Sequence, residues 1–200
     1  MKTIHIIRHA ESLANKGEKT EKHDTIPLSE LGRIQARNLL EKLDVVPDLI
    51  ITSSFTRTQE TAAPYIERHK GVPIEVWEVE EFTYLDTTKY SNTTPEERAP
   101  AVKEFWGKQD ITFKDAEHTE SYLDFTKRVI NFVQRVTVRE EERIVIFSHG
   151  MFILTLKNYL EIRENNLQVD DIAKKLMELQ KKHNHLISPI HNTSIHTILV

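Results

Sequence analysis

The sequence predicts an α/β protein with three layers, in which a mostly parallel sheet is flanked by helices on both faces. Short apolar runs rich in Ile and Val occur at residues 3–7, 49–52 and 144–147, and such runs are typical of buried parallel strands. Segments with helical spacing of apolar residues follow these runs. Strands that alternate with helices favour a parallel sheet that is covered on both sides.

The first two predicted helices follow the first two strand-like runs. Ser29 can cap a helix that begins at Glu30, and Pro47 stops it. Its apolar residues recur at helical spacing: Leu31, Ile34, Leu39, Leu40 and Leu43. A second helix is expected over residues 55–69, where Pro64 should kink or interrupt it.

The clearest helical pattern starts near Ser121 and runs toward Arg139. It has a single apolar stripe, which consists of Tyr122, Phe125, Val129, Phe132, Val133 and Val136. Further helices are expected after Gly150 and over about residues 170–182. Residues 193–200 are expected to close the fold as a strand.

Length and composition limit the classes of protein. Two hundred residues are enough for one sizeable α/β domain, so we expect a single domain over residues 1–200. The net charge of −4 provides no basic field for nucleic acid or an anionic membrane, which makes small molecules the expected partners. The absence of cysteine excludes disulfides, thiolate zinc sites and thiol nucleophiles.

Two apolar segments are too short for a targeting or a membrane segment. In residues 1–11, His5 and Arg8 interrupt the apolar residues well short of a signal-peptide core. Residues 144–156 are too few to cross a bilayer. We therefore expect a cytoplasmic protein, whose oligomeric state the sequence leaves open because no interface differs from an ordinary helix face.

Polar residues stand directly after three of the strand-like runs. Arg8 and His9 follow the first, residues 53–57 follow the second, and Ser148 with His149 follow a later one. Ligands of parallel sheets bind outside the carboxyl ends of the strands, where loops and helix N-termini meet. Two guanidiniums, Arg8 and Arg57, match phosphate oxygens with paired donors. The pattern predicts a phosphoryl-transfer site with a histidine nucleophile.

The size of the kinetic barrier favours covalent catalysis at this site. Hydrolysis of a phosphate monoester needs an acceleration on the order of 20 powers of ten, whereas one general acid supplies about 10² to 10⁴. A phosphohistidine intermediate divides the reaction into two easier steps. Cations around His9 disfavour its protonation and preserve the lone pair that must attack phosphorus. Ser53, Ser54 and Ser148 are expected to be loop and cap residues, because no nucleophile-elbow motif surrounds them.

These segments resemble the motifs of the histidine phosphatase superfamily, the group also called phosphoglycerate mutase-like. Residues 8–12 with Asn15 resemble its first motif, and residues 148–150 resemble its second histidine motif. Further similarity lies in residues 27–32 with Gln35, in Ser53, Ser54, Arg57, Thr58, Thr61 and Ala62, and in residues 192–194. Ala10, Leu85 and Thr119 stand where the family commonly has glycine. The resemblance implies the phosphoglycerate mutase-like fold.

The resemblance also implies roles for individual residues. His9 would be the nucleophile, Arg8, Arg57 and His149 would complete the phosphate pocket, and Asn15 would add a substrate contact. The family's general acid falls within residues 78–85. We choose Glu81, because the aromatic-containing tetrad after it fits the family pattern best. Glu80 and Glu78 remain the alternatives.

Residues 82–118 form the expected lid or specificity segment. Thr94 as N-cap, Pro95 and Glu97 predict a helix start, and Pro100 should limit or bend that helix. Tyr84 and Tyr90 are expected to contact the alcohol part of a substrate, and we choose Tyr84 as a binding residue. Aromatic residues of this segment, such as Phe105 and Trp106, fit packing equally well.

The predicted function is a metal-independent phosphatase that acts on a small phosphorylated metabolite without a cofactor. The sequence has no P-loop, kinase or dinucleotide motif and only five glycines. His183, His185, His191 and His196 are expected to be solvated rather than metal ligands, because they lack ligand spacing. Two alternatives remain. One is a phosphomutase of the same family, although residues 13–25 lack the Trp-Asn and Thr-Gly-Trp elements of such mutases. The other is a non-catalytic phosphoryl-binding module.

Overall fold

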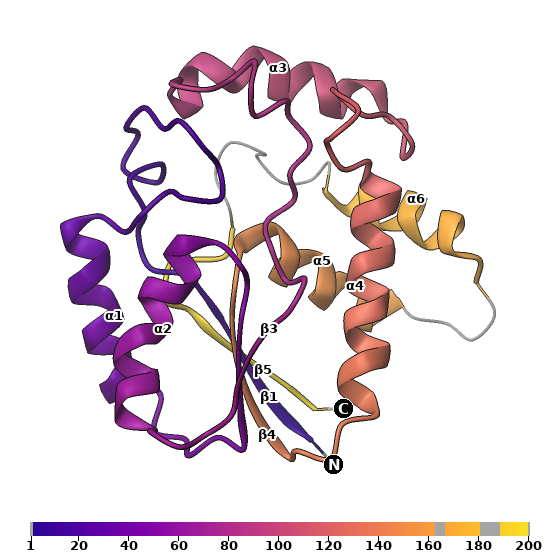
Figure 1. Ribbon diagram of the computed structural model, residues 1–200. Helices are drawn as coiled ribbons and strands as arrows, with labels where there is room; N and C mark the ends of the chain where they lie inside the picture. The colour runs from indigo at the N-terminus through magenta and orange to yellow at the C-terminus, as the bar shows by residue number, and fades with distance from the viewer. Residues whose placement is uncertain (1, 163–166, 181–188, 200) are drawn as a thin grey trace.

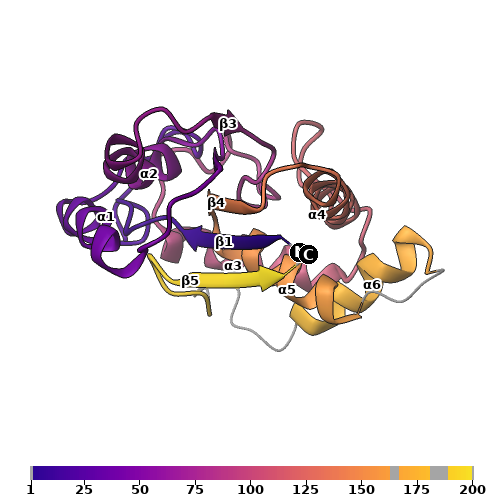
Figure 2. The same cartoon turned by 90° about the horizontal axis from the view of Figure 1, so that it is seen from below.

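A computed structural model describes residues 2–162, 167–180 and 189–199, and these residues form a sheet of five strands (Figure 1). The strand order is β3-β2-β4-β1-β5. All neighbouring strands are parallel except β5, which runs antiparallel beside β1 at one edge (Figure 2). The strands are β1 (Thr3–Arg8), β2 (Leu49–Thr52), β3 (Ile74–Val76), β4 (Arg143–Ser148) and β5 (Ile195–Leu199).

Helices cover both faces of this sheet, as the sequence predicted. Helices α1 and α2 lie against one face, and α4, α5 and α6 lie against the other, while α3 lies above the carboxyl ends of the parallel strands (Figure 1). Their bounds are α1 (Glu30–Lys42), α2 (Thr56–Arg68), α3 (Pro95–Lys108), α4 (Tyr122–Thr137), α5 (Gly150–Ile162) and α6 (Val169–Gln180). None of these helices combines the length and apolarity that a membrane crossing requires.

The central strands are apolar on both faces because both faces are covered. Ile4 and Ile6 of β1 pack in the cluster formed with α4, α5 and α6. Ile7 of the same strand points to the opposite face, where Leu39 of α1 and Tyr65 of α2 are buried. Successive side chains of a strand alternate between faces, so a run without polar interruption serves a sheet with two cores.

The predicted helix starts are confirmed at three caps. Ser29 accepts a hydrogen bond from the backbone N–H of Gly32 at 2.9 Å. Thr94 and Ser121 each form a capping box, with Glu97 and Asp124 as the respective partners. These side chains satisfy backbone donors that the first turn of a helix leaves free.

Neither of the two prolines ends its helix, so the interruption at Pro64 and the limit at Pro100 are not found. Pro64 lies inside α2 and does not interrupt it, and α3 continues past Pro100 to Lys108. A proline inside a helix removes one hydrogen bond. In α2 the fully buried Ala62 and Tyr65 flank the proline, and in α3 the turns beyond Pro100 bury Phe105 and Trp106. Packing of these side chains offsets the missing bond.

The sequence did not predict β3, and it placed the last strand correctly. Ile74 and Val76 of β3 are 50% and 58% exposed, so this three-residue strand shows no buried apolar run. The strand expected over residues 193–200 is β5. The expected end of the sixth helix near residue 182 lies outside the described residues, and α6 is described to Gln180.

A substitution at Gly32 tests the close contact between α1 and the loop after β1. A Cβ atom at this position would lie 2.0 Å from the carbonyl oxygen of Glu11, which also accepts the backbone N–H of Ser29. We expect Gly32→Ala to lower the free energy of unfolding by about 1 to 3 kcal/mol, because the backbone must move. Urea unfolding measures the change.

The matched control for this prediction is Gly107→Ala in the last turn of α3. A Cβ atom at Gly107 meets no heavy atom within 4 Å. Alanine is the better helix former, so this variant should gain up to about 1 kcal/mol. A Gly32→Ala variant as stable as the wild type would contradict the close contact.

Candidate active site

The structure brings the three polar segments together at the carboxyl edge of the sheet. Strands β1 and β4 are neighbours, and their register pairs Arg8 with Ser148. The rings of His9 and His149 therefore lie with their centroids 5.1 Å apart. Arg57, from the first turn of α2, donates from Nε to Nε2 of His9 at 3.3 Å. None of these side chains except Arg8, at 8%, is more than 3% exposed.

Hydrogen bonds orient the imidazole of His9. Its Nδ1 lies 2.7 Å from the carbonyl oxygen of Ala10, which can only accept, so Nδ1 carries the proton. Nε2 accepts from Arg57 and therefore holds a lone pair. Burial first, and then the charges of Arg57 and Arg8, lower the pKa of His9 well below its ordinary value. His9 is a neutral imidazole with Nε2 directed at the guanidinium.

The last loop before β5 supports the backbone at this point. Asn192 donates from Nδ2 to the carbonyl oxygen of His9 at 2.8 Å and to Oδ1 of Asn15 at 3.3 Å. The same oxygen of Asn15 accepts from the backbone N–H of Ser12 at 3.2 Å. Asn15 and Asn192 both line the cavity described below. The oxygen of Asn15 thus holds the loop together. Asn192 was not among the predicted site residues, although the similarity of residues 192–194 to the family pointed to this loop.

His149 is held by Ser53 and retains one unused nitrogen. Its Nε2 lies 2.8 Å from Oγ of Ser53, which is also 2.7 Å from Oγ1 of Thr58. Nδ1 of His149 is buried and has no hydrogen-bond partner, and neither has Nε of Arg8. Burial and the nearby Arg57 and His9 lower the pKa of His149. Buried polar atoms normally have partners, so these two atoms fit a site that binds a polar group.

The two guanidiniums are anchored by backbone carbonyls. Arg8 donates from Nη1 to the carbonyl of Ile190, and Arg57 donates from Nη1 to that of His23 at 2.7 Å. The guanidinium carbon of Arg57 lies 4.8 Å from the ring centre of Phe55. Burial lowers the pKa of Arg57 to about 10, and the carboxylate of Glu81 opposes this shift. Arg57 therefore remains charged near neutral pH.

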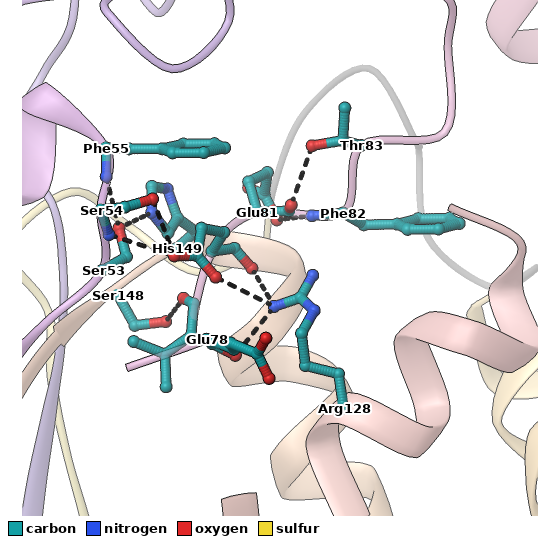
Figure 3. Close-up of polar contacts among 12 residues, drawn as sticks. Ser53, Ser54, Phe55, Glu78, Glu81, Phe82, Thr83, Arg128, Ser148 and His149 are labelled. Atoms are coloured by element: carbon teal, nitrogen blue, oxygen red, sulfur yellow. Dashed lines mark hydrogen bonds and ion pairs between the residues drawn. The ribbon is translucent and has the colours of Figure 1, made fainter. Parts of the chain in front are cut away.

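The three candidate acids occupy different environments, and Figure 3 labels two of them, Glu78 and Glu81. Glu81 accepts from the backbone N–H of Met151 at 2.9 Å and lines the same cavity as Arg8. Glu80 accepts from the backbone N–H and Oγ of Ser54, at 3.1 and 2.9 Å, and does not line the cavity. Glu78 is exposed. The geometry favours Glu81.

A cavity of about 630 Å³ is lined by Arg8, Asn15, His23 and Glu81, whereas His9, Arg57 and His149 are not among its lining residues. The segment 82–118 forms much of its wall, including Tyr84, Tyr90 and Arg98. The ring of Tyr84 also packs against that of Phe105, with centroids 4.6 Å apart, and burial raises the pKa of Tyr84 to about 12. Phe105 and Trp106 belong to the buried core and do not line the cavity. Tyr84 therefore takes part in packing and in the cavity wall.

His23 lies in the site although the sequence did not single it out. It lines the cavity, its ring packs edge-on against Phe55 at 5.3 Å, and its buried Nε2 has no partner. Burial, and then Arg57 and Arg98, lower its pKa to about 3. His23 belongs to a loop without periodic pattern, so only the folded chain places it here.

The histidines near the end of the chain show no metal site in the described residues. No group of three or more His, Asp or Glu side chains that could hold a metal occurs among the residues that the structure describes. His191 lines the cavity, and His196 lies 3.0 Å from Oγ of Ser194. His183 and His185 lie outside the described residues.

Fold and site together define a class, an α/β protein with two histidines and two arginines gathered at the carboxyl edge of its sheet. The chain belongs to the histidine phosphatase superfamily (branch 1), whose family model matches residues 4–192. This match confirms the resemblance drawn from the motifs.

Solved structures share the fold, which confirms the predicted fold class. YhfR of Bacillus stearothermophilus is 24% identical with a TM-score of 0.71, over 100% of this chain and 92% of that one. Phosphoserine phosphatase of Entamoeba histolytica is 21% identical with a TM-score of 0.67, over 100% and 91% of the two chains. A mycobacterial glucosyl-3-phosphoglycerate phosphatase is 25% identical with a TM-score of 0.64, over 86% and 83%.

A shorter match links the chain to a curated protein. A probable phosphatase of Schizosaccharomyces pombe is 38% identical over 74 residues, which are 36% of this chain. The match spans only 34% of that relative's length.

The pH dependence of stability tests the environment of His23. Between its ordinary pKa of 6.5 and its folded pKa of about 3, the unfolded chain binds a proton that the folded chain excludes. The free energy of unfolding should therefore fall as the pH falls from 7 to 5. His23→Gln should make that fall shallower by up to about 2 kcal/mol. Urea unfolding in phosphate-free buffer measures both slopes, and identical slopes would contradict the buried neutral state of His23.

Proposed function

We propose that the protein is a metal-independent phosphatase that hydrolyses a phosphate monoester through a phosphohistidine on His9. The observation that supports this most strongly is the tautomer of His9. With Nδ1 bonded to the carbonyl of Ala10 and Nε2 unprotonated beside Arg57, the ring presents a nucleophilic lone pair where an anion would bind. Imidazole of this kind attacks phosphorus without prior loss of a proton.

In the first step, Nε2 of His9 forms a bond to phosphorus while the bond from phosphorus to the ester oxygen breaks. Arg8, Arg57 and His149 donate to the transferring oxygens, and each well-placed donor contributes roughly 3 to 4 kcal/mol of transition-state stabilisation. Glu81 gives its proton to the departing alkoxide, which leaves as the alcohol. The position of Glu81 supports this role, because it lines the same cavity as Arg8 and is held there by the backbone N–H of Met151.

In the second step, water attacks the phosphohistidine. Glu81, now a carboxylate, accepts a proton from the water while oxygen bonds to phosphorus and the bond from nitrogen to phosphorus breaks. Inorganic phosphate leaves, and His9 and Glu81 return to their starting states. The step needs no metal and no other cofactor.

Two features bear on the alternatives. A non-catalytic phosphoryl-binding module needs no acid, whereas Glu81 lies in the cavity wall with Arg8. Phosphomutase activity fits the sequence less well than phosphatase activity does, because residues 13–25 lack the Trp-Asn and Thr-Gly-Trp elements of such mutases. Phosphatase activity therefore accounts for more of the site.

We propose a small phosphorylated metabolite as the substrate. A cavity of about 630 Å³ lies within the range of roughly 300 to 1,000 Å³ of small-molecule sites. The substrates in the names of the similar structures, phosphoserine and glucosyl-3-phosphoglycerate, are small phosphate esters. Asn15 and Tyr84, both in the cavity wall, would contact the substrate.

The organisation and location of the protein also remain proposals. We propose one domain over residues 1–200 in which residues 82–118 act as a specificity lid, supported by their large share of the cavity wall. Nucleic acid is not an expected partner, and a cytoplasmic location remains a prediction from the sequence.

Trapping the intermediate tests the proposed function. Brief reaction with a ³²P-labelled ester, followed by alkaline denaturation, should leave about one labelled phosphoryl group per chain, and free phosphate should form without a bisphosphate primer. His9→Ala should lose both labelling and turnover, because no other side chain supplies this lone pair. His5→Ala, in the strand that His9 follows and hydrogen-bonded to Thr197 at 3.1 Å, is the matched control and should retain both.

The same assay in excess chelator tests the metal-free chemistry. Unchanged turnover is expected, and strong loss would overturn that part of the proposal. Labelling that persists in His9→Ala would overturn His9 as nucleophile.

A further inference from the structure

The segment that contains Glu81 has no regular secondary structure. Residues 77–85 follow β3 without forming a strand or a helix. A general acid must nevertheless lie within hydrogen-bond reach of the oxygen that it protonates. The contacts that fix this irregular segment therefore determine where the Glu81 carboxylate lies.

The side chain of Arg128, from α4, donates hydrogen bonds to backbone carbonyls of this segment (Figure 3). Its Nη1 donates to the carbonyl oxygens of Glu78 and Glu80, at 3.1 and 2.9 Å. These two carbonyls lie just before Glu81 in the chain. One side chain thus holds the chain on the N-terminal side of the proposed acid.

Glu120 holds the chain on the other side of Glu81. Its backbone N–H donates to the carbonyl of Thr83 at 2.9 Å, and its carboxylate accepts from the N–H of Thr83 at 3.2 Å. The same carboxylate accepts from Nε and Nη2 of Arg128, both at 2.8 Å. The two residues form a fork-shaped ion pair, which fixes geometry better than a single contact.

The surroundings make this ion pair rigid. The side chain of Arg128 is only 12% exposed, and its guanidinium carbon lies 5.0 Å from the ring centre of Phe125 and 5.7 Å from that of Phe152. Each of its three guanidinium nitrogens donates to the protein. Neither Arg128 nor Glu120 lines the cavity. They can act on substrate only through the segment between Glu78 and Thr83.

We propose that Arg128, paired with Glu120, is the positioning residue for the general acid Glu81. This inference rests on the proposed function and extends it to a residue outside the cavity. Arg128 sets the distance between the Glu81 carboxyl and the ester oxygen, and its hydrogen bonds go to Glu78, Glu80 and Glu120 rather than to the phosphate pocket. Displacing a catalytic group by about 1 Å can reduce the rate on the order of 10²-fold.

Leaving-group dependence separates this role from a purely structural one. p-Nitrophenyl phosphate releases a stable anion and needs no proton, whereas glycerol phosphate releases an alkoxide that does. The ratio kcat/KM reports events up to release of the leaving group. For Arg128→Lys, kcat/KM on glycerol phosphate should fall on the order of 10²-fold, and that on p-nitrophenyl phosphate should change less than about threefold.

Arg128→Lys should also change the time course with p-nitrophenyl phosphate. Glu81 must accept a proton from water in the second step, so its displacement slows hydrolysis of the phosphohistidine. We expect a burst of about one nitrophenolate per chain before a slower steady state. The burst shows that the variant is folded and that its phosphate pocket works.

Three further variants complete the experiment. Glu81→Gln is the reference and should show the same selective loss, and Arg128→Lys combined with Glu81→Gln should lose no more than Glu81→Gln alone. Glu120→Gln retains the backbone hydrogen bond from residue 120 to the carbonyl of Thr83, and it should show a smaller selective loss on glycerol phosphate. Lys127→Arg is the control at the neighbouring, exposed position of α4 and should behave like the wild type.

The outcomes are distinguishable. Equal losses on both esters in Arg128→Lys and Glu120→Gln, including complete loss in both, would assign these residues a structural role and overturn the inference. Wild-type rates on both esters would overturn it too. If the wild-type protein hydrolyses neither ester and no phosphohistidine forms, it is the proposed function that fails.

Discussion

The hydrogen bond from His9 Nδ1 to the carbonyl of Ala10 is the interaction on which the site depends. It fixes the proton on the nitrogen that faces the protein and leaves Nε2 for chemistry. Arg57 can then donate to Nε2 only because that atom is unprotonated. Burial beside two guanidiniums reinforces this state, since a second proton on the ring would add a third positive charge in a water-poor space.

This arrangement gathers positive charge and polar atoms at one place. Arg8 and Arg57 are both buried, and Nε of Arg8, Nδ1 of His149 and Nε2 of His23 have no partner among the described residues. A bound phosphoryl group would supply negative charge and hydrogen-bonding oxygens. The arrangement therefore favours an anionic ligand.

The proposed acid comes from a different part of the fold than the nucleophile. His9 and His149 follow strands whose register fixes them, whereas Glu81 lies in an irregular segment held by α4 and by the N-terminus of α5. Sheet hydrogen bonds position His9 and His149. Arg128 and Glu120 hold the segment of the acid, and Ser54 and Ser148 join that segment to the strand ends beside the phosphate pocket.

The sequence predicted what local patterns encode. Strands β1, β2 and β4 are short apolar runs that end at polar residues such as Arg8, His9 and His149, so the sequence predicted the fold class and that these polar segments meet. The strand β3 was missed because Ile74 and Val76 are exposed, and α2 continues past Pro64 because packing outweighs one lost hydrogen bond.

Other features depend on contacts between distant segments. His23 enters the site through Phe55 and Arg57, which lie more than thirty positions further along the chain. Glu81 and Glu80 are adjacent in an irregular segment, so no periodicity tells which carboxylate faces the cavity. Ser54 and Arg128 bind the carboxylate of Glu80, so Glu81 is the carboxylate that lines the cavity.

The charge and tautomer of His9 test the account most directly. Nitrogen-15 NMR of the imidazole, assigned by comparison with His9→Ala, reports which nitrogen carries a proton as the pH is varied. The account predicts a neutral ring with Nδ1 protonated and Nε2 unprotonated at pH 7 and still so near pH 6. An imidazolium in that range, or a proton on Nε2, would contradict it.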